Sequence, residues 1–135
     1  MAVRFDAMGI IVEDMEKSLA FYALLGLEIP PGTHSEGHVE LNLARGLRLM
    51  LDTVDIVRSF SRWEPPTGGH RIALAFLCGS PEEVDDRHRL IVAAGNRSHV
   101  APFDAPWGQR YATVLDPDGN PVDLFAPLPA TDSVV

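Results

Sequence analysis

The chain has 135 residues, and its 11 basic against 19 acidic side chains give a formal net charge of −8. With 46% hydrophobic and 22% charged residues, the composition is that of a folded globular protein and excludes a disordered one. The acidic balance argues against nucleic acid as a partner, because nucleic-acid binding requires clustered Lys and Arg. A single cysteine, Cys78, excludes an intrachain disulfide and a thiolate metal cluster.

The apolar segments are short throughout the chain. None at the start is long enough for a signal peptide, and none elsewhere approaches the roughly 20 residues that span a bilayer. We therefore expect no membrane partner and a cytoplasmic location.

The first half begins with a strand followed by a helix. The apolar run Met8–Val12 indicates a buried strand, and Asp14 directly after it is placed to cap a helix. Apolar residues then recur at helical spacing up to Gly26, which is typical of a helix end. We expect one further short strand near Glu28–Ile29, before Pro30-Pro31-Gly32.

Two strands are predicted after this breaker. Apolar and polar residues alternate over 38–43 and again over 47–52, which is typical of strands with one face buried. Ala44-Arg45-Gly46 between them fits a tight turn. Residues 55–69, with Trp63 and a Pro- and Gly-rich run, are expected to be a connection without an element of its own.

The second half starts the same pattern again. Ile72–Cys78 indicates a buried strand, and Ser80-Pro81-Glu82-Glu83 is a strong helix start, since Ser80 can cap the Glu83 amide while Glu83 reaches back. Gly95 is expected to end that helix. Strands follow at Tyr111–Leu115 and Val122–Ala126.

The two halves therefore repeat one β-α-β-β-β order about 70 residues apart, which indicates an internal duplication. The fold class predicted is α+β, with two curved mixed sheets that form a cleft and with the helices outside. Module 1 covers about residues 4–54, module 2 about 70–128, and the turn Asp116–Asn120 of module 2 corresponds to the turn at Arg45-Gly46. Residues 129–135 are expected to be a loose tail.

Two segments are similar to a known family. The first module of the vicinal oxygen chelate superfamily resembles three consecutive segments of this chain, Gly9–Asp14, Ser18–Tyr22 and Leu25–Leu27. Asp116–Phe125 resembles the end of its second module. The superfamily comprises glyoxalase I, extradiol dioxygenases, fosfomycin-resistance enzymes and bleomycin-resistance proteins, and the resemblance covers roughly residues 4–128. It implies the fold just described, while function depends on the site.

The resemblance also implies where a divalent metal would be held in the enzymes of this superfamily. The first of four ligand positions falls on Ala7, and the last position of module 1 falls near Met50, two residues before Asp52. In module 2, His70 is a possible displaced ligand, and Asp123 occupies a ligand position. One carboxylate in four positions predicts no metal site, so we expect no cofactor, with a divalent metal as the alternative.

Aromatic and polar residues instead predict a binding surface for a planar ligand. Indole rings beside loops offer broad flat surfaces, and the resemblance to bleomycin-resistance proteins includes the pair Trp107-Gly108 before the turn. Packing under its own loop is the alternative for Trp107, as is packing on Pro65-Pro66 for Trp63. The candidate ligand-binding residues are Trp63, Trp107, Arg110, Tyr111, Arg48, Met50, Asp52, His38, Asp123 and Phe125.

Three functions follow from these residues. The first is a metal-independent binding protein that sequesters a planar drug or metabolite, with Arg48, Arg110 and Asp123 orienting its polar groups. The second is a metal-dependent lyase, isomerase or dioxygenase. The third is a metal-free enzyme with Asp123 as the general base. A homodimer is expected for any of them, and the sequence does not name the ligand.

Overall fold

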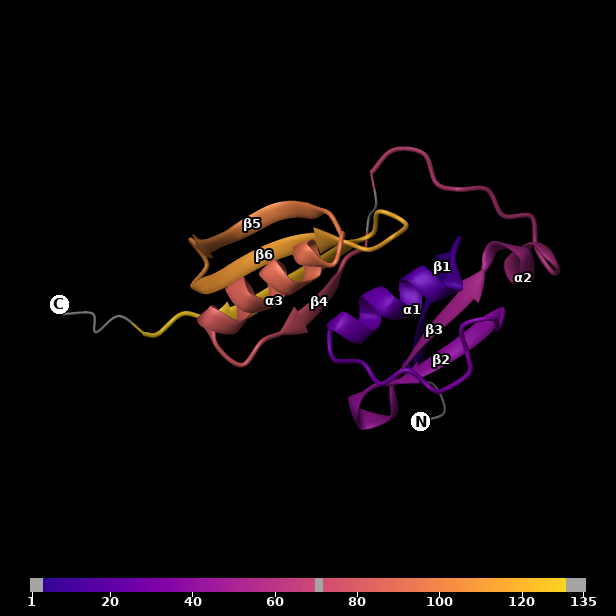
Figure 1. Cartoon of the computed structure of the whole chain (residues 1–135), viewed down its shortest axis with the longest axis horizontal. Helices are drawn as coiled ribbons and strands as arrows, with labels where there is room; N and C mark the ends of the chain where they lie inside the picture. The colour runs from indigo at the N-terminus through magenta and orange to yellow at the C-terminus, as the bar shows by residue number, and fades with distance from the viewer. Residues whose placement is uncertain (1–3, 70–71, 131–135) are drawn as a thin grey trace. The chain divides into compact units, whose positions relative to one another are not determined.

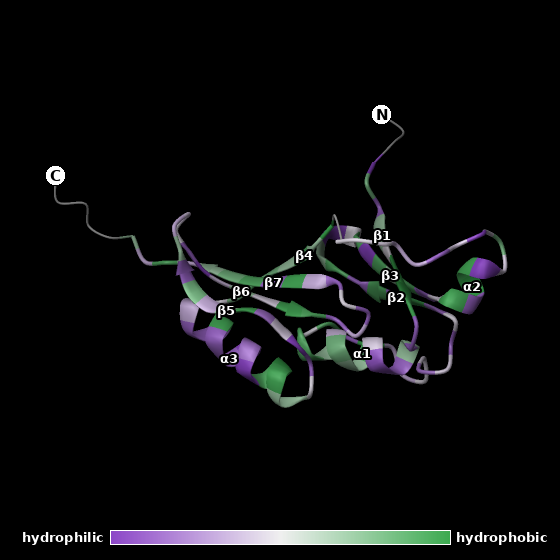
Figure 2. Ribbon diagram, turned by 90° about the horizontal axis from the view of Figure 1, so that it is seen from above, coloured by the Kyte–Doolittle hydropathy of each residue, from purple (hydrophilic) through white to green (hydrophobic). Residues whose placement is uncertain are grey.

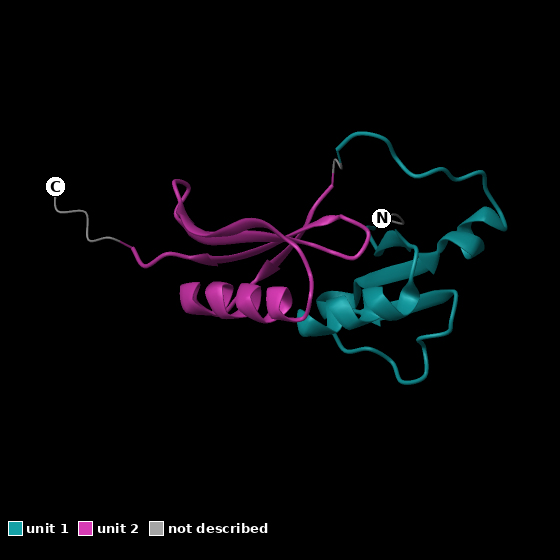
Figure 3. Ribbon diagram, turned by 45° about the horizontal axis from the view of Figure 1, so that its top comes forward, with its two compact units in different colours: residues 1–69 teal, residues 70–135 magenta. Residues whose placement is uncertain are grey.

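The computed structural model describes residues 4–69 and 72–130, and the chain divides into two compact units, residues 1–69 and 70–135 (Figure 3). Most of the predicted tail lies outside the described residues. In the first unit the elements are β1 (Ala7–Val12), α1 (Met15–Leu24), β2 (His38–Asn42), the short 3₁₀ turn Ala44–Gly46, β3 (Arg48–Thr53) and α2 (Val54–Arg58). In the second unit they are β4 (Leu74–Leu77), α3 (Pro81–Ala93), β5 (Ser98–Ala105), β6 (Gln109–Leu115) and β7 (Pro121–Pro127).

The first sheet has the strand order β1-β3-β2 (Figure 1). β1 is parallel to β3, and β2 is antiparallel to β3. Strand residues alternate between two faces, and one face supplies a core of fully or almost fully buried side chains. Together with the inner face of α1, this core consists of Val12, Met15, Leu19, Phe21, Tyr22, Val39, Leu41, Leu49 and Leu51.

The start of α1 agrees with the sequence. The side chain of Asp14 accepts a hydrogen bond of 3.0 Å from the backbone N–H of Lys17, which satisfies one of the free amide groups in the first turn. Gly26, with φ of 87°, ends the helical run, because a glycine adopts this left-handed conformation without a steric penalty.

The strand expected at Glu28–Ile29 is absent from the first unit, where residues 25–37 are described without any strand. The two prolines that follow have no N–H to donate to a ladder, and Gly32 turns the chain with φ of 75°. The first sheet therefore has three strands, against four in the second.

The second sheet has the order β4-β7-β6-β5, with β4 parallel to β7 and the other pairs antiparallel. α3 contacts β5, β6 and β7 and covers one face (Figure 1). In Figure 2 the strands are largely hydrophobic, whereas hydrophilic and hydrophobic bands alternate along α3. The buried residues of this unit include Val84, Ile91, Ala112, Val114, Val122, Leu124 and Ala126. The α+β fold with two mixed sheets is thereby confirmed.

The predicted start of α3 is also confirmed. Ser80 accepts a hydrogen bond of 3.1 Å from the Glu83 backbone N–H, and Pro81 occupies the first turn. The Glu83 side chain reaches back to the N–H of Gly79 at 2.8 Å, one residue earlier than in a standard capping box.

The repeated β-α-β-β-β order implies strand β5, but the sequence pattern identified no residues for it. Its sequence contains Pro102, and its pairing with β6 shifts register twice, between Ser98 and Val100 and between Val100 and Phe103. A proline and bulges are tolerated because β5 is an edge strand, but they remove the alternation that would identify it.

Both predicted turns are present. Arg45 and Gly46 have positive φ values of 63° and 76°, which reverse the chain between β2 and β3. In the other turn, Asp116 Oδ1 accepts hydrogen bonds from the backbone N–H groups of Asp118 and Asn120 at 3.0 and 2.8 Å. Such a side chain replaces a missing backbone partner within the turn.

The predicted connection 55–69 begins within helix α2, so the expectation that it contains no element was wrong. Thr53 caps α2 by accepting from the backbone N–H of Ile56 at 3.3 Å. Among the described residues, no helix is both long and apolar enough to cross a membrane.

The cap of α3 provides a test of the fold. We expect Ser80→Ala to reduce the free energy of unfolding by about 1 kcal/mol, because the Glu83 amide loses its partner. Urea denaturation monitored by circular dichroism measures this, with Ser35→Ala in an exposed loop as the control. Equal stability of the two variants would contradict the role of the cap.

Candidate functional site

Each sheet packs one face on its helix. The side chains that alternate with the packed ones form the second face, which we call the open face. In the first unit Met50 of β3 pairs with Gly9 of β1. In the second unit Asp123 of β7 pairs with Ala75 of β4. Gly9 and Ala75 lie the same number of residues before their helix N-caps, so Met50 and Asp123 occupy equivalent positions on the two open faces.

This equivalence allows a direct check of the residues that the superfamily uses for metal. Ala7, two residues before Gly9, corresponds to Ala73, two residues before Ala75. The four equivalent positions therefore carry Ala7, Met50, Ala73 and Asp123, of which only Asp123 offers an oxygen to a hard divalent ion. This donor set does not fit the metal. His70 lies outside the described residues, and elsewhere no group of three or more His, Cys, Asp or Glu side chains in the described ranges could hold an ion.

The open face of the first unit carries a chain of alternating charges. His38 Nδ1 lies 2.6 Å from Asp52 Oδ1, and His38 Nε2 lies 2.8 Å from Glu40 Oε2. Arg48 then donates to Glu40 Oε1 at 2.7 Å and also to Asp6. Register explains this, because Asp52 is directly opposite His38, and Glu40 lies opposite Met50, beside Arg48. The predicted residues His38, Arg48, Met50 and Asp52 thus share one face.

His38 needs a proton on both ring nitrogens to satisfy its two carboxylate partners, and only the imidazolium has both. The hydrogen bond to Glu40, followed by that to Asp52, raises the pKa of His38 above its ordinary value of 6.5, against a smaller effect of burial. Hydrogen bonds from His38 and then Arg48 lower the pKa of Glu40. Because both nitrogens of His38 are occupied, this arrangement does not present a free imidazole as a ligand or base.

The open face of the second unit carries an aromatic cluster formed by Phe103, Trp107 and Tyr111. The ring centroids of Trp107 and Tyr111 are 5.2 Å apart, and Phe103 lies 6.1 Å from Trp107 and 6.2 Å from Tyr111, all edge to face. Trp107 Nε1 donates to Gln109 Oε1 at 2.9 Å, which fixes the indole edge. Trp107 nevertheless remains 58% exposed, so the rings form an ordered but accessible apolar surface.

Asp123 lies beside the cluster and accepts a hydrogen bond from a neighbouring strand. The buried hydroxyl of Thr113 donates to Asp123 Oδ1 at 2.7 Å, across the β6–β7 pair. Tyr111 is the diagonal neighbour of Asp123 on this face, since Tyr111 pairs with Phe125 and Thr113 pairs with Asp123. Burial, followed by the nearby Asp123 carboxylate, raises the pKa of Tyr111 to about 12. Phe125 is directly opposite Tyr111 in the register and completes this face.

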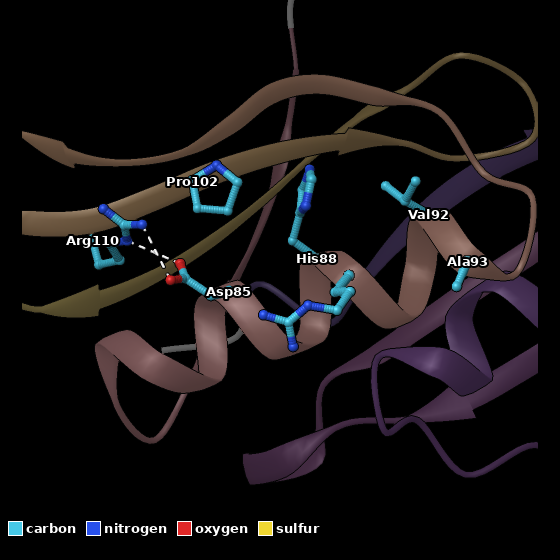
Figure 4. Close-up of a pocket in the computed structure, with 7 residues that line it drawn as sticks. Asp85, His88, Val92, Ala93, Pro102 and Arg110 are labelled. Carbon is cyan, nitrogen blue, oxygen red and sulfur yellow. Dashed lines mark hydrogen bonds and ion pairs between the residues drawn. The ribbon is translucent and has the colours of Figure 1, made fainter.

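Arg110 does not join this group, because it alternates with Tyr111 and faces α3. Its guanidinium makes a two-point ion pair with Asp85, at 2.9 and 3.1 Å, and contacts Asp104 at 3.0 Å. It lies at one end of a pocket of about 510 Å³ between α3 and β5, where His88 points from the helix toward the strands (Figure 4). His88 Nε2 lies 2.7 Å from Ser98 Oγ, and burial lowers its pKa.

Trp63 belongs to the segment after α2. The guanidinium of Arg58 lies 5.9 Å from its ring centroid, and Arg58 Nε donates to its carbonyl oxygen at 3.3 Å. Trp63 therefore has a cation–π partner on α2. Its packing on Pro65-Pro66 stays a prediction.

Three residues of the second open face were not among the candidates. Phe103 lies on the unpredicted strand β5, and Thr113 and Gln109 lie on β6. The period of two along β6 places Gln109 and Thr113 on the same face as the candidate Tyr111, so it could have identified both of them. Phe103 carries no such signal, because two register shifts precede its pairing with Tyr111.

A family model described as the Glyoxalase/Bleomycin resistance protein/Dioxygenase superfamily matches residues 4–124. The chain belongs to this superfamily. The resemblance noted in the sequence is therefore confirmed over almost the whole length.

Several solved structures share the fold. A glyoxalase/bleomycin resistance protein/dioxygenase family enzyme from Burkholderia phytofirmans PsJN has a TM-score of 0.75 at 22% identity, covering 91% of this chain and 98% of that one. A glyoxalase-related enzyme from Fulvimarina pelagi has a TM-score of 0.76 at 21% identity, with coverage of 91% and 87%. A hypothetical protein from S. aureus has a TM-score of 0.77 at 21% identity, with coverage of 93% and 94%. No curated protein matches the sequence.

The charged chain on the first open face leads to a pH-dependent prediction. Since folding raises the pKa of His38, its stabilising effect is complete below pH 6.5 and is lost as pH rises through the raised value. We expect an NMR titration of the imidazole protons to give a pKa above 6.5, and Glu40→Gln or Asp52→Asn to lower it. A value at or below 6.5, unchanged in both variants, would show that the carboxylates do not hold the ring.

Proposed function

We propose that this superfamily member is a metal-independent small-molecule-binding protein that sequesters a planar drug or metabolite. The observation that carries the proposal is the ordered, accessible cluster of Phe103, Trp107 and Tyr111 beside Asp123. Aromatic rings held at fixed angles bind a flat apolar ligand with little loss of conformational entropy. A few polar groups next to them orient the ligand. The expected homodimer and cytoplasmic location stay predictions.

The donor chemistry of the open faces favours this function over a metal-dependent lyase, isomerase or dioxygenase. Ala7, Met50 and Ala73 replace oxygen or nitrogen ligands with groups that bind a hard divalent ion poorly or not at all. We therefore propose that the protein works without a resident metal or other cofactor.

The hydrogen bonds of Asp123 bear on the third function, a metal-free enzyme with Asp123 as general base. A general base needs a free lone pair directed at the substrate proton. Asp123 Oδ1 already accepts from Thr113, an arrangement that suits a fixed acceptor for a ligand better than a proton-abstracting group.

Metal content tests the metal-independent proposal. We expect protein purified without chelators, then incubated with Zn²⁺, Mn²⁺, Ni²⁺ or Fe²⁺, to hold metal that is substoichiometric and lost on dialysis, because the equivalent positions lack donors. Elemental analysis measures this. One tightly held metal ion per chain that disappears in an Asp123→Ala variant would overturn the proposal and direct attention to glyoxalase and dioxygenase assays.

The aromatic cluster gives the test of the binding function itself. We expect Trp107→Ala to weaken binding of planar antibiotics or metabolites by about 1–3 kcal/mol while folding is retained, because Trp107 is largely exposed. Titration by tryptophan fluorescence and calorimetry measures the affinity. Arg110→Lys is the control, since this side chain lies on the α3 face and keeps its charge. Unchanged affinity in Trp107→Ala would remove this residue from the site.

A further inference from the structure

The hydrogen bonding of Asp123 on the second open face fixes its carboxylate as an acceptor. Thr113 donates its hydroxyl proton to Asp123 Oδ1 at 2.7 Å. Asp123, as a carboxylate, offers acceptors alone, and the Thr113 hydroxyl has no second proton to donate. Tyr111, the diagonal neighbour of Asp123 on this face, adds a hydroxyl oxygen that can accept as well as donate. The acceptors of the Asp123 carboxylate therefore dominate the polar end of the site.

The described strand positions of this face carry a negative charge, which also favours a cationic ligand. Residues at the open-face positions of β4 are Ala75 and Leu77, and those of β6 and β7 add Gln109, Tyr111, Thr113, Leu115, Pro121, Asp123, Phe125 and Pro127. Asp123 is the single charged side chain among them, and all of these positions are described. The nearest cation along β6, Arg110, points to the other face and is held there by Asp85.

We propose that the second open face selects planar ligands that carry a cationic hydrogen-bond donor, an ammonium or an amidinium, and rejects carboxylates of the same ring system. This inference rests on the proposed binding function and adds its ligand class. The ring of the ligand packs on Trp107 and Phe103, and its N–H groups donate to Asp123 and to the Tyr111 oxygen. A ligand carboxylate in the same place meets the charge of the Asp123 carboxylate, which leaves two anionic acceptors opposed.

Three probes with one ring system test the selectivity on the unmodified protein. They are (naphthylmethyl)ammonium, naphthoate and the neutral ketone acetylnaphthalene, titrated by calorimetry at raised ionic strength to screen the net charge of −8. We expect the ammonium to bind about tenfold or more tightly than naphthoate, with the ketone between them, as a hydrogen bond to a charged group implies. This comparison requires no variant, so it decides the proposal even if a substitution at Asp123 prevents folding.

Two variants with the same change in net charge locate the effect. Asp123→Asn removes the carboxylate and introduces an amide donor, and we expect it to bring ammonium and naphthoate within about threefold of each other. Asp104→Asn removes one charge from a side chain that pairs with Arg110 on the α3 face, and we expect the preference to remain.

The outcomes separate this inference from the function beneath it. Similar affinities for all three probes, each weakened by Trp107→Ala, would leave the binding function standing and overturn the selectivity. A preference that survives Asp123→Asn but is lost in Asp104→Asn would also overturn it. Binding of none of the probes would contradict the proposed function itself.

Discussion

The parallel pair formed by the first and last strand of each unit, β1 with β3 and β4 with β7, positions the candidate site residues of this protein. A parallel pair requires a crossover, and the crossover contains the helix. The helix covers one face of the sheet, and the apolar side chains on that face are buried against it. The residues between them, at a period of two, are left on the open face whatever their chemistry. The residue pair Gly9 and Met50 in the first unit is equivalent to the pair Ala75 and Asp123 in the second.

The same scaffold carries different chemistry on its two open faces. On the first, three acidic side chains alternate with His38 and Arg48, so that most donors and acceptors satisfy one another. These ion pairs are partly exposed, and their contribution to stability is correspondingly small. On the second, no cation among residues 4–69 and 72–130 forms an ion pair with Asp123, which lies beside the aromatic cluster. The second face can recognise a ligand because it is ordered, partly apolar and carries a charge that is not neutralised. On the first face the charged groups already pair with one another, so fewer of them can contact a ligand.

The positions that the resemblance assigns to metal ligands carry mostly small or apolar side chains in this chain. Ala7 and Ala73 offer methyl groups and Met50 a thioether, whereas Asp123 offers a carboxylate that accepts from Thr113. The fold fixes these positions, and the side chains at them set the chemistry of each open face.

Local sequence signals determined most of the elements. Caps at Asp14 and Ser80, the turns at Gly46 and Gly119, and the alternation along β2 and β3 depend on neighbours within a few residues, so they were readable without the fold. The expected strand at Glu28–Ile29 did not form, and β5 was missed, because edge strands depend on a partner supplied from elsewhere in the chain. Which side chains meet was decided by register between strands that are far apart in sequence.

The register between strands also decides which of the predicted candidate residues lie on the same face. Asp123 and Tyr111 were brought together, and Arg110, one position away, was turned to the opposite face, because a shift of one residue along a strand reverses the direction of the side chain. The sequence by itself determined the family, the duplicated architecture and the absence of donors at Ala7 and Met50. Only the tertiary structure decided that Thr113 donates to Asp123 and that Phe103 joins Trp107, since these contacts arise from pairing across β5, β6 and β7.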